Sequence, residues 1–133
     1  DVLLGRALVA DGKPDDGLLR AAIGVAALER ARPNSASLAQ AREWQAMALL
    51  DAGRIADARA GMDQVLALRR DTLKVPPRAL VITRLLAARA ARLDGDTAAA
   101  AMHLAHVEEV RRQAALSGRA EKMYRAEAAS QGR

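Results

Sequence analysis

The apolar residues of this chain recur every three or four positions, which is the spacing that gathers side chains on one face of an α-helix. β-Branched and aromatic residues are sparse, and they never alternate with polar residues over a run as they would in a half-buried strand. The pattern therefore predicts an all-α fold. Around Gly53 the two predicted stripes consist of Leu38, Ala41, Trp44, Ala48 and Leu49 before it, and of Ile55, Ala58, Met62, Val65 and Leu66 after it.

Three similar phrases, LVADG, LLDAG and ARLDG, end at Gly12, Gly53 and Gly95. Glycine adopts the left-handed conformation that ends many helices at little cost, so these glycines are predicted to set the turns between paired helices. Gly53 lies 41 positions after Gly12, and Gly95 lies 42 positions after Gly53. The chain is therefore interpreted as a helical repeat with a period of 41 to 42 residues.

Proline marks the joints between the repeats, at Pro33 and at Pro76-Pro77, because it cannot continue a helix interior. It does suit a first helical turn, so Pro77 is predicted to begin a helix. Ser117 and Gly118 are predicted to end the sixth helix, and a seventh would cover the end of the stack. The predicted helices lie near residues 2–11, 15–31, 36–51, 55–71, 77–93, 97–116 and 119–129.

We expect a single domain over residues 1–133, because stacked helical hairpins share one elongated core. A compact bundle with accidental glycine spacing is the alternative. The helical pattern begins at the first residue, so we expect the chain to be part of a larger protein. The expected units are repeat 1 (about 1–33), repeat 2 (about 35–72), repeat 3 (about 76–117) and a capping helix (about 119–129).

The composition is that of a globular protein, with 51% hydrophobic and 28% charged residues. Cysteine is absent, which excludes disulfides and thiolate metal sites. We find no apolar run of the ~20 residues that span a bilayer and no cationic leader, and we therefore expect a cytoplasmic location. The net charge of +5 favours an acidic peptide, a phosphate backbone or an anionic surface. GC-rich codons would produce the same bias towards arginine.

The stretch from Leu49 to Ala58 resembles the turn of a tetratricopeptide repeat (TPR), in which a small residue follows the glycine five positions later. The period exceeds the ~34 residues of the ordinary repeat and resembles the kinesin-light-chain-like variant, which also occurs in bacterial regulatory proteins. The first unit departs from the pattern, since Ala21 stands where the family has a large residue. The matching positions are Gly17, Ala58 and Ala100 after the glycines, Met62 and Leu104 four residues later, and Gly5, Ala46 and Ala88 in the first helices.

This resemblance implies a TPR-like α-α superhelix and a non-catalytic scaffold that grips a peptide or a partner helix in a concave groove. Such a module would regulate a larger bacterial protein. Forked guanidinium groups pair well with carboxylates, so an acidic partner is expected. The groove positions that the resemblance implies are Val2, Arg6, Gln40, Glu43, Met47, Asp51, Ile82, Leu85, Arg89, Arg92 and Tyr124.

The residues that could carry chemistry do not form a known site. His103 and His106 are three positions apart, which places them about 60° apart on a helix, and no second cluster could complete a metal site. Gly12 and Gly17 have the spacing of a phosphate loop, but the Lys-Ser/Thr pair is missing. We therefore expect no enzyme activity, no cofactor and no metal.

Two other functions remain open at this stage. The C-terminal cations could bind nucleic acid, although acidic residues are interspersed and stacking aromatics are nearly missing. Self-association is the other alternative, since a short solenoid exposes an apolar end, and Met123 and Tyr124 on the last helix would then lie in a dimer interface. The cations in question are Arg111, Arg112, Arg119, Lys122 and Arg125.

Overall fold

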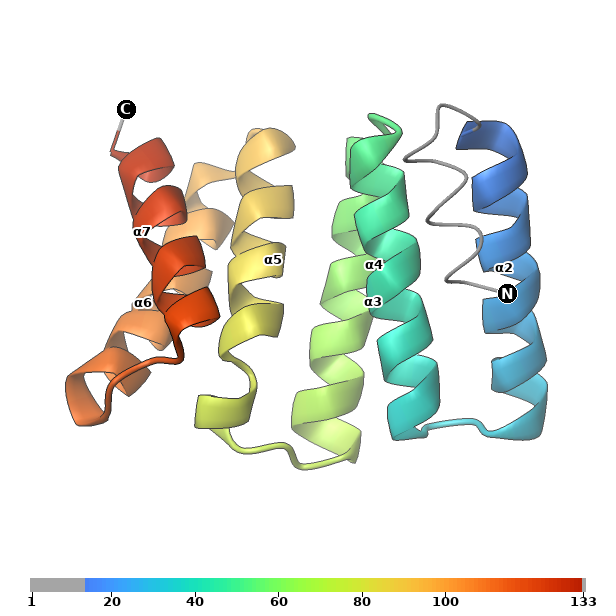
Figure 1. Cartoon of the computed structure of the whole chain (residues 1–133), viewed down its shortest axis with the longest axis horizontal. Coiled ribbons are helices and arrows are strands. Elements are labelled where there is room, and N and C mark those ends of the chain that lie inside the picture. Colours follow the sequence, from blue (N-terminus) through green and yellow to red (C-terminus); the bar gives the residue numbers. More distant parts are fainter. Residues whose placement is uncertain (1–13, 133) are drawn as a thin grey trace.

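Over residues 14–132, the part that the computed structural model describes, the protein consists of helices joined by short turns and loops and contains no strand. This confirms the predicted all-α class. The helices stand side by side in a row along the long axis of the molecule (Figure 1). They are α2 (Pro14–Ala31), α3 (Ala36–Asp51), α4 (Ile55–Ala67), α5 (Val81–Leu93), α6 (Thr97–Gln113) and α7 (Gly118–Gln131). The helix expected near residues 2–11 and the turn at Gly12 lie outside the described residues.

Three helices begin at a side chain that caps their first turn. The Ser35 hydroxyl accepts a hydrogen bond from the Leu38 amide at 3.1 Å, and Asp96 accepts one from the Ala99 amide at 3.0 Å. Ser117 caps α7 in the same way. Each cap satisfies a backbone donor that the helix itself leaves free, and α3 and α6 start where the sequence predicts. The prediction that Ser117 and Gly118 end the sixth helix is wrong: α6 ends at Gln113, and Ser117 and Gly118 begin α7.

The joint between α4 and α5 differs from the prediction of two uninterrupted helices. The first helix leaves α geometry at Ala67 and ends in a π-helical turn, Leu68–Thr72, and the second is preceded by a 3-10 turn, Pro77–Ala79. Pro76 is extended (φ −68°, ψ 156°) and neither proline can donate a backbone hydrogen bond, so no helix continues through the pair. The connection therefore bends over a longer stretch than the helical pattern suggests.

The two helical hairpins, α3–α4 and α5–α6, turn in the same way. Gly53 and Gly95 both lie in the left-handed region, at φ +78° and +83°. In the first turn the amides of residues 52, 53 and 54 donate to the carbonyls of residues 48, 50 and 49, and the same three bonds occur 42 positions later. Small residues lie buried at equivalent helix contacts in both hairpins, namely Ala46, Ala58, Ala88 and Ala100.

Replacing Gly53 or Gly95 by alanine is expected to lower the free energy of unfolding by about 1–2 kcal/mol, because an L-residue is strained in this conformation. An added Cβ atom meets nothing within 4 Å at either position, so the cost is purely conformational. Urea denaturation measures it. Gly118, which also has open space and does not have a positive φ, is the matched control, and its alanine variant should be at least as stable as the wild type. Equal stability of all three variants would contradict the prediction.

The core consists of three clusters that follow one another along the row of helices. The first joins α2 and α3, the second joins α3, α4 and α5, and the third joins α5, α6 and α7. Alanine dominates these contacts and lets the helices approach closely. A Cβ atom added to Gly61 on α4 would lie 3.3 Å from the Cβ atom of Ala46 on α3.

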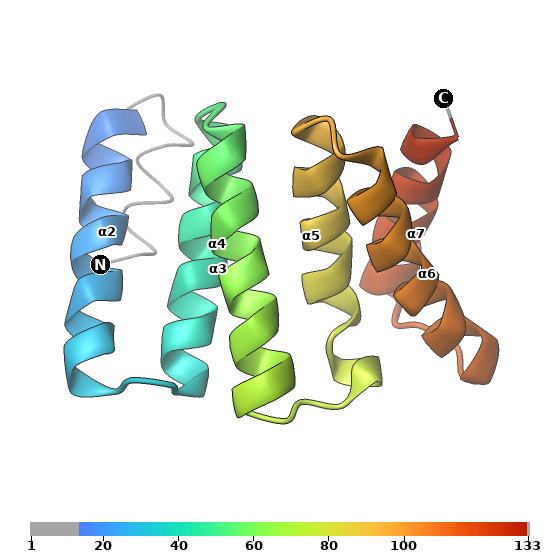
Figure 2. The same ribbon diagram turned by 180° about the vertical axis from the view of Figure 1, so that it is seen from behind.

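Each helix packs against the next one along the chain, and α7 packs against α5 as well as α6. In Figure 1, α3, α5 and α7 lie on the near side, and the reverse view in Figure 2 brings α4 and α6 to the front. The helices that come first in each hairpin therefore share one face with α7. None of the described helices combines the length and the apolar character needed to cross a membrane.

Candidate partner-binding cleft

A cleft of about 230 Å³ lies between α5 and α7. Three of the residues predicted for the groove, Leu85, Arg89 and Arg92, line it together. They fall on one side of α5 because their spacing of four and three residues keeps them on one helical face. The remaining lining residues are Leu86 on the same helix and Met123, Ala126, Glu127 and Ser130 on α7.

Arg92 holds the two walls of the cleft together. Its Nε donates to Glu127 Oε2 at 2.7 Å and its Nη2 donates to Oε1 at 3.2 Å. Glu127 is only 5% exposed, and it also accepts a hydrogen bond from Gln131 at 3.2 Å. The bond to Glu127 raises the pKa of Arg92, so the guanidinium remains charged across the neutral range. Arg92 is therefore engaged within the protein.

Arg89 is the exposed cation of the cleft. No carboxylate pairs with it among residues 14–132, whereas Arg92, one turn further along α5, has its bidentate partner. Leu85 and Leu86 form the apolar floor beside it and are almost fully buried. The cleft thus combines one available guanidinium group with a small apolar surface.

Further apolar side chains lie along α3, α5 and α7, the three helices that share one face. Met47 on α3, Ile82 on α5 and Met123 on α7 are half-buried and pack against the same core cluster. Gln40 is half-buried on α3, and Asp51 is exposed at the end of that helix. Val2 and Arg6, predicted for the first unit, lie outside the described residues.

Glu43 was predicted to face the groove, and the structure corrects this. The residue is 8% exposed and forms an ion pair with Arg69 of the π-helical turn. The Nη1 atom of Arg69 also donates to the Thr83 hydroxyl at 2.8 Å, so the cluster joins α3, the joint and α5. The helical pattern predicts that a carboxylate with no nearby partner is exposed. Glu43 is buried because Arg69, 26 positions away in the sequence, pairs with it. Glu43 is therefore part of the core.

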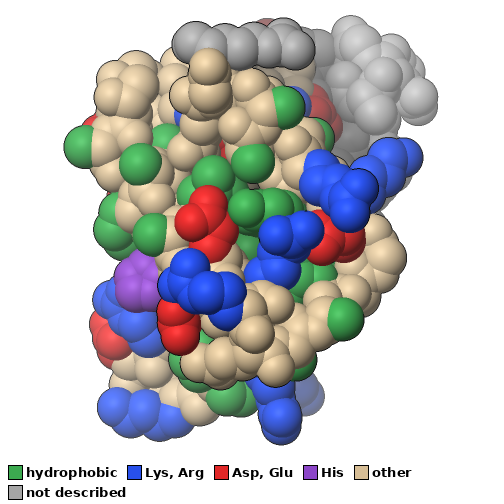
Figure 3. Space-filling model, turned by 90° about the vertical axis from the view of Figure 1, so that its left-hand side faces the viewer, with side chains coloured by type: hydrophobic (Ala, Val, Ile, Leu, Met, Phe, Trp, Pro, Cys, Tyr) green, Lys and Arg blue, Asp and Glu red, His purple; other side chains and the backbone are tan. Residues whose placement is uncertain are grey.

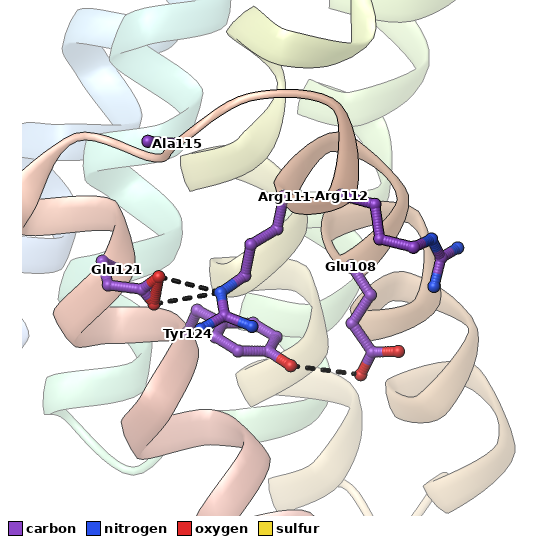
Figure 4. A pocket seen from close by; sticks show the side chains of 6 residues that line it. All are labelled: Glu108, Arg111, Arg112, Ala115, Glu121 and Tyr124. Atoms are coloured by element: carbon purple, nitrogen blue, oxygen red, sulfur yellow. Dashed lines mark hydrogen bonds and ion pairs between the residues drawn. The ribbon is translucent and has the colours of Figure 1, made fainter.

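Tyr124 also lies elsewhere than predicted. It lines a separate cleft of about 470 Å³ between α6 and α7 (Figure 4). Its hydroxyl donates to Glu108 at 3.5 Å, and the guanidinium carbon of Arg111 lies 4.7 Å from the centre of its ring. The Nε atom of Arg111 in turn donates to Glu121 at 2.8 Å. Tyr124 therefore belongs to an internal network that lines a different cleft from Met123 and Ser130.

The cations proposed for nucleic-acid binding are largely paired. Arg111 and Arg125 both contact Glu121, and Arg112 contacts Glu109. Figure 3 shows the end of the molecule that α6 and α7 form, where basic and acidic side chains lie next to one another with hydrophobic ones between them. At this end of the described part of the chain, such alternation leaves no continuous positive surface for a phosphate backbone.

The two histidines occupy different environments. His106 is exposed, whereas His103 is buried between α5 and α6 and its Nδ1 lies 3.1 Å from Nη1 of Arg84. Burial, with Arg84 as a second cause, lowers the pKa of His103 to about 4. Nδ1 of the neutral ring then accepts the hydrogen bond from Arg84. Among residues 14–132, no three His, Cys, Asp or Glu side chains are grouped as metal ligands.

Sequence reasoning missed the part of the cleft that α7 contributes. Met123, Glu127 and Ser130 recur at spacings of four and three, which is a helical stripe, but only Met123 among them is a large apolar residue. A signal in the sequence is Ala120, a small residue one turn before Met123 that marks the face of α7 that packs against the other helices; it is buried in the structure. Comparison with family models, curated proteins and solved structures finds no match to this chain.

Proposed function

We propose that this chain is a short TPR-like array and a non-catalytic scaffold, which binds a peptide or partner helix along α3, α5 and α7 as a regulatory module of a larger bacterial protein. The repeated hairpin geometry supports the array, because the same left-handed glycine and the same three turn hydrogen bonds recur after 42 residues. Neighbouring repeat units with one helix each on a common face form an extended binding surface.

The cleft between α5 and α7 carries the binding proposal. The exposed Arg89 lines the cleft together with the half-buried Met123, and Met47 and Ile82 pack half-buried against the same core cluster as Met123; this suits a ligand with an acidic residue next to an apolar anchor. The guanidinium fork of Arg89 would bind the carboxylate, and Met47, Ile82 and Met123 would receive the apolar side chain. The expected partner is thus an acidic amphipathic segment.

The substitution Arg89→Glu is expected to weaken binding of such a segment by at least about tenfold. A charge-assisted hydrogen bond between the Arg89 guanidinium and the ligand carboxylate would be replaced by repulsion between two carboxylates. Peptides selected from a phage-displayed library of random dodecapeptides against the wild-type chain provide the probes. Their affinities for both proteins are measured by fluorescence polarisation.

The control is Arg30→Glu, which makes the same charge change on an exposed residue of α2, far from the cleft. Both variants should keep the wild-type melting temperature. A change at Arg92 is less informative, because glutamate there would face Glu127 and destabilise the walls of the cleft. Selected peptides without acidic residues, or peptides that bind the Arg89 and Arg30 variants equally well, would rule out the cleft as the binding site.

A further inference from the structure

A second pocket, of about 250 Å³, lies where the joint between α4 and α5 meets α6. Its apolar walls consist of Val75, Pro77, Leu80, Val81 and Val107. Arg84 and Arg89 are five residues apart on α5, which places them about 140° apart around its axis. This pocket and the partner-binding cleft therefore open on different faces of α5.

Arg84 lines this pocket and has no carboxylate partner among the described residues, although it is only 8% exposed. Its Nη1 atom lies 3.1 Å from His103 Nδ1 and 3.9 Å from the Met102 sulfur, and these are its only side-chain hydrogen-bond partners within residues 14–132. A neutral imidazole and a thioether compensate a guanidinium charge poorly. Buried charges in proteins are ordinarily paired, so the missing anion needs an explanation.

Other arginines of this protein show the ordinary arrangement. Arg69 pairs with Glu43, Arg92 pairs with Glu127, and Arg59 donates to Asp94 and Asp96 at 3.1 and 2.5 Å. All three are more exposed than Arg84, which is the one arginine classed as buried among residues 14–132. Arg84, the most deeply buried arginine among residues 14–132, thus lacks an internal carboxylate.

The charges near the pocket leave an excess of positive charge. Arg70 lines the pocket and pairs with Asp71 at 2.7 Å, so these two balance. His106 lines it as well, and burial together with Arg84 lowers its pKa, which keeps the ring neutral at pH 7. Arg84 remains uncompensated, and burial and the nearby Arg70 lower its pKa, as expected for a cation that lacks a counter-ion.

We propose that this pocket binds a carboxylate carried on an aliphatic body, with the carboxylate on Arg84 and the aliphatic part between Leu80, Val75 and Val107. The volume corresponds to about eight water-sized groups at roughly 30 Å³ each, so the bound part is the size of one side chain. A free aliphatic acid and the C-terminal apolar residue of another polypeptide both present this chemistry. The walls are predominantly hydrocarbon, which disfavours a phosphate or another fully hydrated anion.

Hexanoate is the first probe, with hexanol as its uncharged counterpart, and the methyl signals of Val75, Leu80 and Val107 in NMR spectra report binding. Hexanoate should shift all three signals in a saturable way, and hexanol should bind at least about tenfold more weakly because it lacks the charge that Arg84 requires. Unchanged methyl signals, or equal binding of the alcohol, would overturn the proposal. This measurement needs no variant.

A second binding experiment distinguishes a free aliphatic acid from the C-terminal carboxylate of a polypeptide. Acetyl-Gly-Gly-Leu is compared with its C-terminal amide. Tighter binding of the free peptide acid than of hexanoate, with loss on amidation, identifies a chain terminus as the ligand. Binding of hexanoate alone identifies a free acid. Equal binding of the acid and the amide would overturn a role for the carboxylate.

Arg84→Met is the decisive variant, because methionine retains much of the length and removes the charge. Binding of hexanoate should weaken at least about tenfold, whereas the melting temperature should stay near the wild-type value or rise, since no internal carboxylate loses its partner. Arg78→Met is the control: it removes an exposed arginine of the same joint that does not line the pocket. Undiminished binding to the Arg84 variant would refute the assignment.

Discussion

Replacing Glu43 by leucine is expected to lower the free energy of unfolding by about 3 kcal/mol, because Arg69 would keep its charge in a mostly buried position and lose its carboxylate. The Thr83 hydroxyl is the other side-chain group that contacts Arg69 Nη1, and a neutral hydroxyl replaces little of the lost interaction. Guanidinium chloride denaturation followed by circular dichroism measures the change. An exposed glutamate on a helix would cost a few tenths of a kcal/mol.

The double variant Glu43→Leu/Arg69→Met distinguishes two causes of the lost stability, the uncompensated charge of Arg69 and altered packing. Replacing a buried ion pair by hydrophobic residues of similar volume is often neutral or stabilising, so the second substitution should restore most of the lost stability. If the double variant were as unstable as Glu43→Leu alone, the loss would come from altered packing, and the uncompensated charge of Arg69 would not be its cause.

Acidification from about pH 7.5 to about pH 5 is expected to remove about 2 kcal/mol of stability through His103. The pKa of this residue is about 4 in the folded protein, below the usual 6.5 of an unfolded chain. Between these two values the unfolded state binds more protons, so stability falls as the pH decreases through this window and is fully present above it. The buried ring beside Arg84 cannot accept a proton at low cost.

Urea denaturation at the two pH values tests this expectation. His103→Gln should flatten the dependence of the free energy of unfolding on pH, because the glutamine carbonyl still accepts a hydrogen bond from Arg84 and does not titrate. His106→Gln is the control and should keep most of the pH dependence of stability, since His106 is exposed. Carboxylates whose pKa is lowered, such as Asp96 by the Ala99 amide, lose their contribution only near and below about pH 4. An unchanged slope in the His103 variant would contradict the assignment.

The elements that local chemistry determines were predictable from the sequence. The range of α3 and the glycine turns at Gly53 and Gly95 follow from capping residues and from the left-handed preference of glycine. The proline joint was located correctly, but its π-helical and 3-10 turns were not predicted. These depend on how α4 and α5 meet, which the helical period does not encode.

The candidate site was harder to predict because it depends on the rotation of each helix about its axis. On α5 the strong apolar stripe fixes that rotation, and Leu85, Arg89 and Arg92, which the TPR resemblance implies for the groove, line one cleft. On α7 few large apolar residues are present, so the sequence does not determine which face packs against α5; the resemblance implies Tyr124, whereas Met123 and Glu127 line the cleft. Buried ion pairs between residues distant in sequence, such as Glu43 and Arg69, leave no local signal.

The cluster of Glu43, Arg69 and Thr83 also bears on how a chain of similar units avoids misassembly. Repeat proteins can misfold by slipping one unit along the stack, because the units present similar faces to one another. The positions 42 residues later hold Leu85, Arg111 and Arg125, which cannot form the same cluster. A stack that slipped by one unit would bury Glu43 against the wrong neighbour and leave it unpaired. The polar cluster thus makes the interface between α3, the joint and α5 chemically different from the next one along the chain, which disfavours a slipped stack.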